Sequence, residues 1–164
     1  MTFASADLCD ANAALLDDGR LAVLPPVFRH FGRHAQFSGR VLTLKLFEDN
    51  PLLRATLETP GHGRVLVVDG GASLRCALLG GQLALLAQDN GWAGLVIDGC
   101  VRDTDEINQC AIGVRALATH PRRSGRSGGG QTDVRVVIQG VPVNPGDWLY
   151  ADADGILVAR QKLA

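Results

Sequence analysis

The chain has 164 residues, of which 46% are hydrophobic and 20% charged, and its formal net charge at pH 7 is -1. This length suits one globular domain over residues 1–164, and no apolar stretch is long enough to span a bilayer. A near-neutral chain has no general attraction to nucleic acid or anionic lipid, so we expect neither direct nucleic-acid binding nor membrane attachment. The sequence begins without a basic, apolar leader, which predicts a cytoplasmic protein.

The four cysteines are far apart in the sequence, and none forms the C-x-x-C spacing of a zinc site or redox pair. We therefore expect them to be reduced and mostly buried. They are Cys9, Cys76, Cys100 and Cys110.

The first third of the chain predicts two helices and one strand. Apolar residues at helical spacing predict a short amphipathic helix over 5–16. Residues 21–32 contain a Pro-Pro pair and are expected to be irregular, whereas alternation over 37–47 predicts a strand. Asn50 caps a second helix, which has proline at its first position and ends before Pro60.

The centre of the chain predicts a strand, a helix and a second strand. The continuous apolar runs at 64–71 and 93–99 are typical of strands that are buried on both faces. Between them, apolar residues recur at helical spacing from Leu83, and Gly91 ends the helix. This order predicts two parallel neighbouring strands whose carboxyl ends meet at one edge of the sheet.

The last third predicts short antiparallel strands over 132–159, separated by turn sequences. The fold class is therefore α/β, a layered domain with a mixed sheet and a central βαβ unit. The only basic cluster, in "RRSGRSGGGQ", has glycine and serine neighbours that favour a mobile surface loop. It contains Arg122, Arg123 and Arg126.

Charged residues follow the two central strands. Ligands of open α/β sheets bind beyond the carboxyl ends of the strands, where the sequence places Asp69, Asp98, Arg102 and Asp103. Arg102 could bind a carboxylate, and Asp103 could offer an oxygen ligand to Mg²⁺. The two glycines of "LLGGQLALL" open a helix, so backbone amides from Gly80 to Leu83 could bind an anion.

Each of these residues also has a simpler structural explanation. Asp98 could cap the turn after its strand, and Arg102 and Asp103 could form a surface ion pair. For the adjacent pair the two explanations are about equally favoured. The structural explanation is preferred for Asp69, as a turn residue. It is also preferred for Asp105 and Glu106, as solvated residues in the first turn of a helix. The chain contains no P-loop, dinucleotide-binding, zinc-hydrolase or serine-hydrolase motif.

Five blocks of the sequence resemble the RraA-like family over nearly the full chain: "DLCDA", "FEDN", "GRVLVVDGGASLRCALLGGQLA", "NGWAGLVIDGCVRD" and "DWLYADADGILV". That family contains regulators of ribonuclease E activity and divalent-metal-dependent 4-hydroxy-4-methyl-2-oxoglutarate aldolases. The resemblance implies a swivelling β/β/α domain. It also implies a ring-shaped homotrimer, or a dimer of such trimers, with sites between subunits.

The resemblance also implies roles for particular residues. Arg102 would bind substrate and Asp103 would hold Mg²⁺ or Mn²⁺, while Asp98, or a metal-bound water, could transfer protons. Backbone amides would hold the substrate at Gly80, Gly81, Gln82 and Leu83. The aldolases often have aspartate or asparagine where this chain has Gly81. Regulators can lack the metal-binding aspartate and often have tyrosine at the position of Asp98, so the intact "RD" pair favours an enzyme.

The function expected from this resemblance is that of a class II aldolase. Such a lyase cleaves 4-hydroxy-4-methyl-2-oxoglutarate, or 4-carboxy-4-hydroxy-2-oxoadipate, to pyruvate. It would also decarboxylate oxaloacetate, because both small 2-oxo acids give the same pyruvate enolate. Two alternatives are a non-catalytic regulator that binds ribonuclease E or another RNA-processing partner, and an enzyme that retains the pocket for a different substrate.

Overall fold

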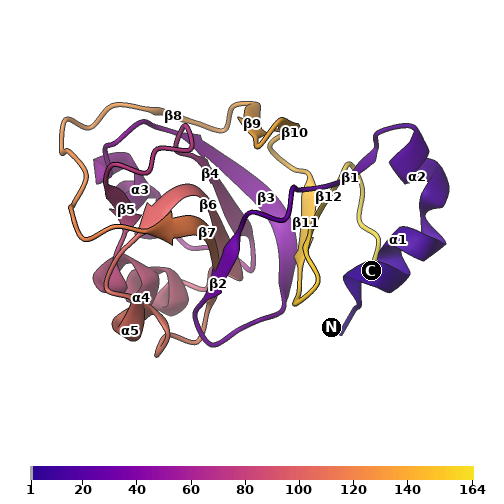
Figure 1. Cartoon of the computed structure of the whole chain (residues 1–164), viewed down its shortest axis with the longest axis horizontal. Coiled ribbons are helices and arrows are strands. Elements are labelled where there is room, and N and C mark those ends of the chain that lie inside the picture. Colours follow the sequence, from indigo (N-terminus) through magenta and orange to yellow (C-terminus); the bar gives the residue numbers. More distant parts are fainter. Residues whose placement is uncertain (1) are drawn as a thin grey trace.

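The structure is a computed structural model that describes residues 2–164. Its main feature is a mixed sheet of ten strands (Figure 1). The strands run in the order β1-β12-β11-β3-β4-β6-β7-β2, and β5 pairs with β6 and β8 with β3. A separate two-stranded sheet is formed by β9 and β10. No helix in residues 2–164 combines the length and hydropathy needed to cross a bilayer.

The strands are β1 (Leu21–Val23), β2 (Arg29–Phe31), β3 (Phe37–Lys45), β4 (Val65–Asp69), β5 (Ala77–Leu79), β6 (Gly94–Val101), β7 (Gly113–Thr119), β8 (Gln131–Thr132), β9 (Val136–Ile138), β10 (Val141–Val143), β11 (Trp148–Ala151) and β12 (Ile156–Ala159). The helices are α1 (Ser5–Ala11), α2 (Ala13–Asp17), α3 (Pro51–Leu57), α4 (Gly81–Asp89) and α5 (Thr104–Ile107).

The central βαβ unit is confirmed. Strands β4 and β6 are parallel neighbours in register from Val65 opposite Gly94 to Asp69 opposite Asp98. Along β4, Leu66 belongs to the apolar cluster beneath the helices, and Val65 belongs to the cluster on the opposite face. Because both faces of the strand are buried, every position from Val65 to Val68 is apolar.

The fold has three layers, two of strands and one of helices. Helices α3, α4 and α5 pack on one face of the parallel strands β3, β4, β6 and β7. The sheet curls so that β11 and β12, together with the β9–β10 hairpin, cover the other face. This arrangement confirms the predicted α/β fold with a mixed sheet and its β/β/α layering.

The N-terminal segment differs from its prediction. In place of one helix over 5–16, α1 and α2 are separated at Asn12, whose backbone is not helical (φ -127°, ψ 35°). The Asn12 side-chain amide donates a hydrogen bond to the Leu8 carbonyl at 2.8 Å. Asparagine favours such local bonds over helix continuation. The two helices pack on β1, β11 and β12.

Other local predictions were incomplete. Residues 21–32 are not wholly irregular, because β1 pairs with β12 and β2 with β7 on either side of the two prolines. Strands β5 and β7 were not predicted. Strand β7 contains Arg115, which is only 4% exposed and donates hydrogen bonds to the Ala35 and Asp152 carbonyls. All four cysteines are free, and three of them are buried, as expected.

Candidate functional site

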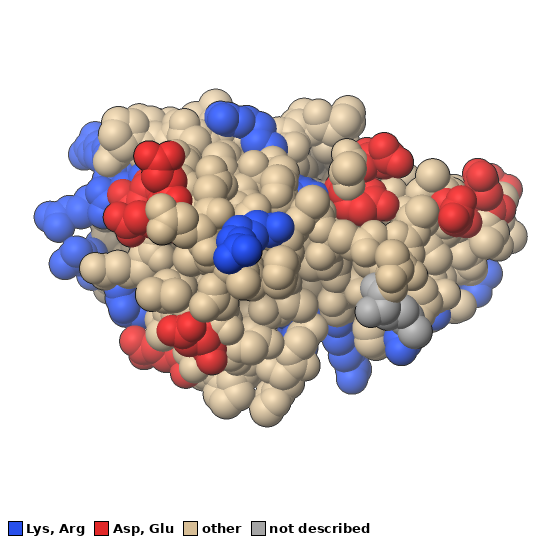
Figure 2. Space-filling view, turned by 90° about the horizontal axis from the view of Figure 1, so that it is seen from below, with Lys and Arg blue, Asp and Glu red and all other residues tan. Residues whose placement is uncertain are grey.

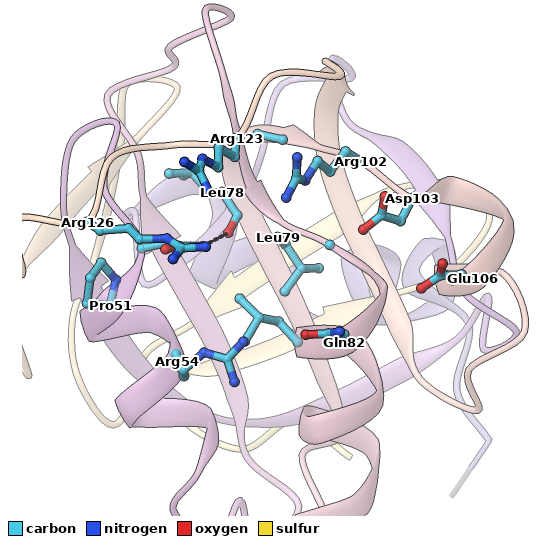
Figure 3. Close-up of a pocket in the computed structure, with 14 residues that line it drawn as sticks. Pro51, Arg54, Leu78, Leu79, Gln82, Arg102, Asp103, Glu106, Arg123 and Arg126 are labelled. Atoms are coloured by element: carbon cyan, nitrogen blue, oxygen red, sulfur yellow. Dashed lines mark hydrogen bonds between the residues drawn. The ribbon is translucent and has the colours of Figure 1, made fainter.

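A cavity of about 510 Å³ lies where β5 and β6 end, between α3, the N-terminus of α4, and α5 (Figure 3). The loop that joins β7 to β8, residues 120–130, closes another side; we call it the arginine loop. The charged side chains that line the cavity are Arg54, Arg102, Asp103, Glu106, Arg123 and Arg126. The structure therefore places the predicted pair Arg102 and Asp103 in one cavity.

Asp103 adopts a left-handed backbone conformation (φ 57°, ψ 46°) at the start of α5. Aspartate is among the few residues that tolerate this conformation, because its short polar side chain can bond locally. Its exposed carboxylate faces the start of α4, where Oδ2 accepts a hydrogen bond from the Gly81 amide at 3.2 Å. The turn after β6 thus directs this carboxylate toward the predicted anion-binding loop.

The two glycines that precede and begin α4 are in close contact with carboxylates. A Cβ atom at Gly80 would lie 2.6 Å from Asp103 Oδ2. A Cβ atom at Gly81 would lie 2.6 Å from the Glu106 Cβ and would also clash with the Glu106 carboxylate. Glycine at both positions therefore allows two acidic side chains to approach the helix N-terminus. One of the amides predicted to bind an anion, that of Gly81, is already bonded to Asp103.

Arg102 is half-buried beside Asp103 without forming an ion pair with it. Its Nη1 donates to the Pro121 carbonyl at 3.4 Å, and its backbone amide donates to the Leu79 carbonyl at 2.9 Å. No ion pair within residues 2–164 includes Arg102 or Asp103. The simpler explanation of these two residues as a surface ion pair is therefore wrong.

Asp98 lies apart from this cavity. Strand β6 continues to Val101, so Asp98 is inside the strand, 3% exposed, and does not cap a turn as one explanation required. Its Oδ1 accepts a hydrogen bond from Gln139 Nε2 at 2.8 Å. Burial raises the pKa of Asp98; the bond from Gln139 opposes this shift and the Asp69 charge adds to it. The structure does not bring Asp98 together with Arg102 and Asp103.

Asp69 has the structural role that the sequence favoured. It ends β4, and its Oδ1 accepts a hydrogen bond from the Gly71 amide at 2.9 Å, which closes the turn. Glu106, by contrast, was expected to be a solvated residue in the first turn of a helix, yet it lines the cavity. The glycine at position 81 is the sequence signal that could have located it.

The arginine loop was expected to be mobile, but it is held in place by Asp49. This carboxylate is 5% exposed and accepts three backbone amides, from Ser127 at 2.7 Å, Gly128 at 2.7 Å and Gly129 at 3.0 Å. The loop therefore brings two of its three arginines, Arg123 and Arg126, to the cavity.

The cavity carries an excess of positive charge. Four guanidinium groups and two carboxylates line it. The ion pairs of residues 2–164 engage none of the six. In Figure 2, basic side chains project at the left end of the molecule, where Figure 1 places the arginine loop. An anionic ligand would balance this charge.

The acidic residues of the cavity suit a hard divalent cation. Mg²⁺ is commonly held by one or two carboxylates and retains waters that a substrate can replace. Asp103 and Glu106 provide two carboxylates, and residues 2–164 contain no cluster of three or more His, Cys, Asp or Glu side chains suited to a metal. The donor set thus fits Mg²⁺ or Mn²⁺ better than a metal that needs a closed protein cage.

The fold of this chain is also found in known proteins. The chain matches the RraA-like family, described as Aldolase/RraA, over residues 5–158 and belongs to that family. This result confirms the resemblance found in the sequence.

Similar proteins carry several names. A Paraburkholderia phymatum protein, provisionally named 4-hydroxy-4-methyl-2-oxoglutarate aldolase, is 59% identical over 163 residues, which are 99% of each chain. The structure of the RNA-processing inhibitor RraA from Thermus thermophilus is 47% identical with a TM-score of 0.93, covering 100% of this chain and 96% of that one. A Geobacillus kaustophilus structure, named S-adenosylmethionine:2-dimethylmenaquinone methyltransferase, is 45% identical with a TM-score of 0.92, covering 98% and 97%. Because these names differ, family membership does not determine the activity.

Proposed function

We propose that this protein is a divalent-metal-dependent lyase that cleaves 4-hydroxy-4-methyl-2-oxoglutarate to pyruvate. The observation that carries the proposal is the convergence of Arg102, Asp103 and the N-terminus of α4 on one cavity. The name of the Paraburkholderia relative supports the same reaction. We propose the related 4-carboxy-4-hydroxy-2-oxoadipate as a second substrate of the same enzyme.

The proposed roles follow from charge and position. Arg102 binds the carboxylate next to the substrate ketone, with help from the backbone amides of Gln82 and Leu83. Asp103 holds Mg²⁺ or Mn²⁺ beside it. When bound, the cation supplies Lewis-acid polarisation of the ketone oxygen.

Proton transfer requires a base inside the cavity. Cleavage begins when the proton of the C4 hydroxyl is removed. The C3–C4 bond then breaks, its electron pair leaves on C3 as pyruvate enolate, and C4 becomes a ketone. Because Glu106 lines the cavity, we assign this step to its carboxylate, whereas Asp98 would have to act from inside β6. Protonation of the enolate at C3 completes the reaction.

Oxaloacetate decarboxylation belongs to the same proposal. Loss of carbon dioxide from oxaloacetate leaves pyruvate enolate, so the groups that stabilise the enolate oxygen would serve both reactions. We therefore expect purified protein with Mg²⁺ or Mn²⁺ to release pyruvate from both kinds of substrate. Pyruvate release, measured by coupled oxidation of NADH, should stop on addition of EDTA and return with excess metal. Turnover that EDTA leaves unchanged would contradict the metal-dependent mechanism.

The second candidate function is regulation of a ribonuclease without chemistry. The observation that favours it is the close likeness to the Thermus RNA-processing inhibitor. We propose that the chain forms homotrimers in either case, as the family resemblance implies. Light scattering coupled to size exclusion would measure the trimer, and affinity capture of ribonuclease E would test the regulator. If the protein shows no lyase turnover and still captures ribonuclease E after Asp103 is replaced, the result would favour regulation over the lyase.

A further inference from the structure

The cavity has two walls of different composition. Arg102 and Asp103 lie at the end of β6, beside the start of α4. Across the cavity, Figure 3 shows Arg54 from α3 and Arg126 from the arginine loop. The proposed reaction uses the first wall only, so the second wall has no role in the chemistry derived above.

The second wall is held in place by several contacts. Besides the three amides bound by Asp49, the Gly125 amide donates to the Glu48 carbonyl at 2.7 Å, and the Asn50 amide donates to the Gly125 carbonyl at 3.2 Å. The loop is also bonded to β5, where the Ala77 amide donates to the Arg122 carbonyl at 2.7 Å. Arg126 is therefore attached to a part of the chain with defined backbone contacts on both sides.

The charge of the second wall is unbalanced. Neither Arg54 nor Arg126 takes part in an ion pair within residues 2–164. Guanidinium groups bind carboxylates through paired hydrogen bonds, and two such groups facing one cavity repel each other until an anion lies between them. A substrate with one carboxylate, held by Arg102, would leave this wall without a counter-charge.

We propose that Arg54 and Arg126 form a distal carboxylate subsite, which selects 2-oxo acids that carry a second carboxylate at the far end. This inference rests on the proposed function, because it places the first carboxylate at Arg102. A cavity of about 510 Å³ is large enough for a small dicarboxylic acid. Arg123 borders this cavity and also a neighbouring one that contains Glu48, so it supports the subsite less directly. Asp49 is a positioning residue, because it acts through the loop.

Equilibrium binding separates the two walls without turnover. The probes are 2-oxoglutarate, which has two carboxylates and lacks the C4 hydroxyl needed for cleavage, and pyruvate, which has one carboxylate. Isothermal titration with Mn²⁺ present should give weaker 2-oxoglutarate binding by about tenfold or more in Arg54→Gln and Arg126→Gln. Pyruvate binding should change less than twofold in both variants.

The matched control is Arg122→Gln. Arg122 lies in the same loop but borders the neighbouring Glu48 cavity, so its variant should bind both acids like the wild type. Equal losses for the two acids in the Arg54 and Arg126 variants would overturn the subsite and leave the proposed function standing. Wild-type protein that binds neither acid would overturn both proposals. Circular dichroism checks that these substitutions of exposed residues leave the fold intact.

Discussion

The two walls of the cavity are built in different ways. The wall with Arg102 and Asp103 follows directly from the parallel strands, because the end of β6 lies beside the helix that precedes it in the chain. The wall with Arg54 and Arg126 depends on a loop that crosses back over the sheet and is held by Asp49. The comparison teaches that strand topology alone positions the groups of the proposed reaction, whereas the proposed selection of substrate depends on Asp49, which is distant in the sequence from the loop that it holds.

The largest effect is expected at the first wall, from Asp103→Asn. Asparagine tolerates the left-handed backbone at this position, so the protein should fold while losing the charge that holds the cation. We expect pyruvate release to fall by about 10² to 10³-fold and Mn²⁺ affinity, measured by electron paramagnetic resonance, to fall with it. The control is Asp105→Asn, which alters an exposed carboxylate of the same helix that does not line the cavity. Mn²⁺ affinity that stays at the wild-type value would refute the assignment of the metal to this wall.

At the second wall, Asp49→Asn removes the charge that three amides bind. We expect KM for a dicarboxylate substrate to rise about tenfold with a smaller change in kcat, and Tm to fall by several degrees. Asp147→Asn is a suitable control, because Asp147 is also 5% exposed and accepts the Asn144 amide at 2.8 Å outside the cavity. That variant should lose stability without the change in KM. If KM rose equally in the Asp49→Asn and Asp147→Asn variants, the role assigned to Asp49 in substrate binding would be wrong.

The stabilising effect of Asp49 should depend on pH. Burial raises the pKa of Asp49, but the amide hydrogen bonds outweigh burial and the net shift is downward. A lowered pKa in the folded state means that this carboxylate stabilises the fold above its unfolded-state pKa of about 3.9, and that the effect is lost as pH falls through the folded pKa. The difference in Tm between wild type and Asp49→Asn should therefore shrink below about pH 4. A difference that stays constant would contradict the charge-based account.

A smaller effect is expected from a substitution that tests the close contact between Gly81 and Glu106 in the first wall. Gly81→Ala places a Cβ atom 2.6 Å from the Glu106 Cβ, which should cost about 1 to 3 kcal/mol of unfolding free energy. In a Glu106→Gly background, which removes the Cβ as well as the carboxylate of Glu106, the same change can become neutral or stabilising, because alanine favours a helix by about 0.5 to 1 kcal/mol over glycine. Denaturant unfolding of the four proteins in this cycle measures the coupling. Equal costs in both backgrounds would place the strain elsewhere.

The smallest effect should come from Asp98→Asn. Because burial raises its folded pKa, ionised Asp98 lowers stability above that pKa, and the penalty disappears below the unfolded-state value. Asparagine keeps an oxygen for Gln139 and removes the charge. We therefore expect Tm to rise by about 2 to 4 °C at pH 7, with pyruvate release retained. If this variant lost turnover while its stability stayed unchanged, Asp98 would have a role in the reaction, and the catalytic groups would include a residue inside β6.

Much of the first wall could be predicted because its signals are local. Continuous apolar runs gave the buried parallel strands, and the "RD" pair and the two glycines lie within a few residues of the strand ends. Asp98 was misplaced because a charged residue usually ends a buried strand. Here Gln139, far away in the sequence, offers a hydrogen-bond partner that lets the strand continue. No local pattern contains that information.

The second wall could not be predicted for the same reason. The glycine and serine residues of the arginine loop are typical of a flexible segment, and nothing near them in the sequence indicates the Asp49 carboxylate. Strand β7 was likewise missed, because Arg115 interrupts its apolar pattern. The Arg115 guanidinium can be buried there because it donates hydrogen bonds to backbone carbonyls of other segments. In each case a distant partner satisfies the polar group. The role of Asp103 in metal binding remains a prediction.

The attachment of the arginine loop to Asp49 has a consequence for folding kinetics. The bond from Ser127 joins residues 78 positions apart in the chain. Contacts of such long sequence separation are slow to form, because a large loop must close before the bond is made. During refolding from denaturant, the ability to bind 2-oxoglutarate should return after the helical circular dichroism signal has recovered.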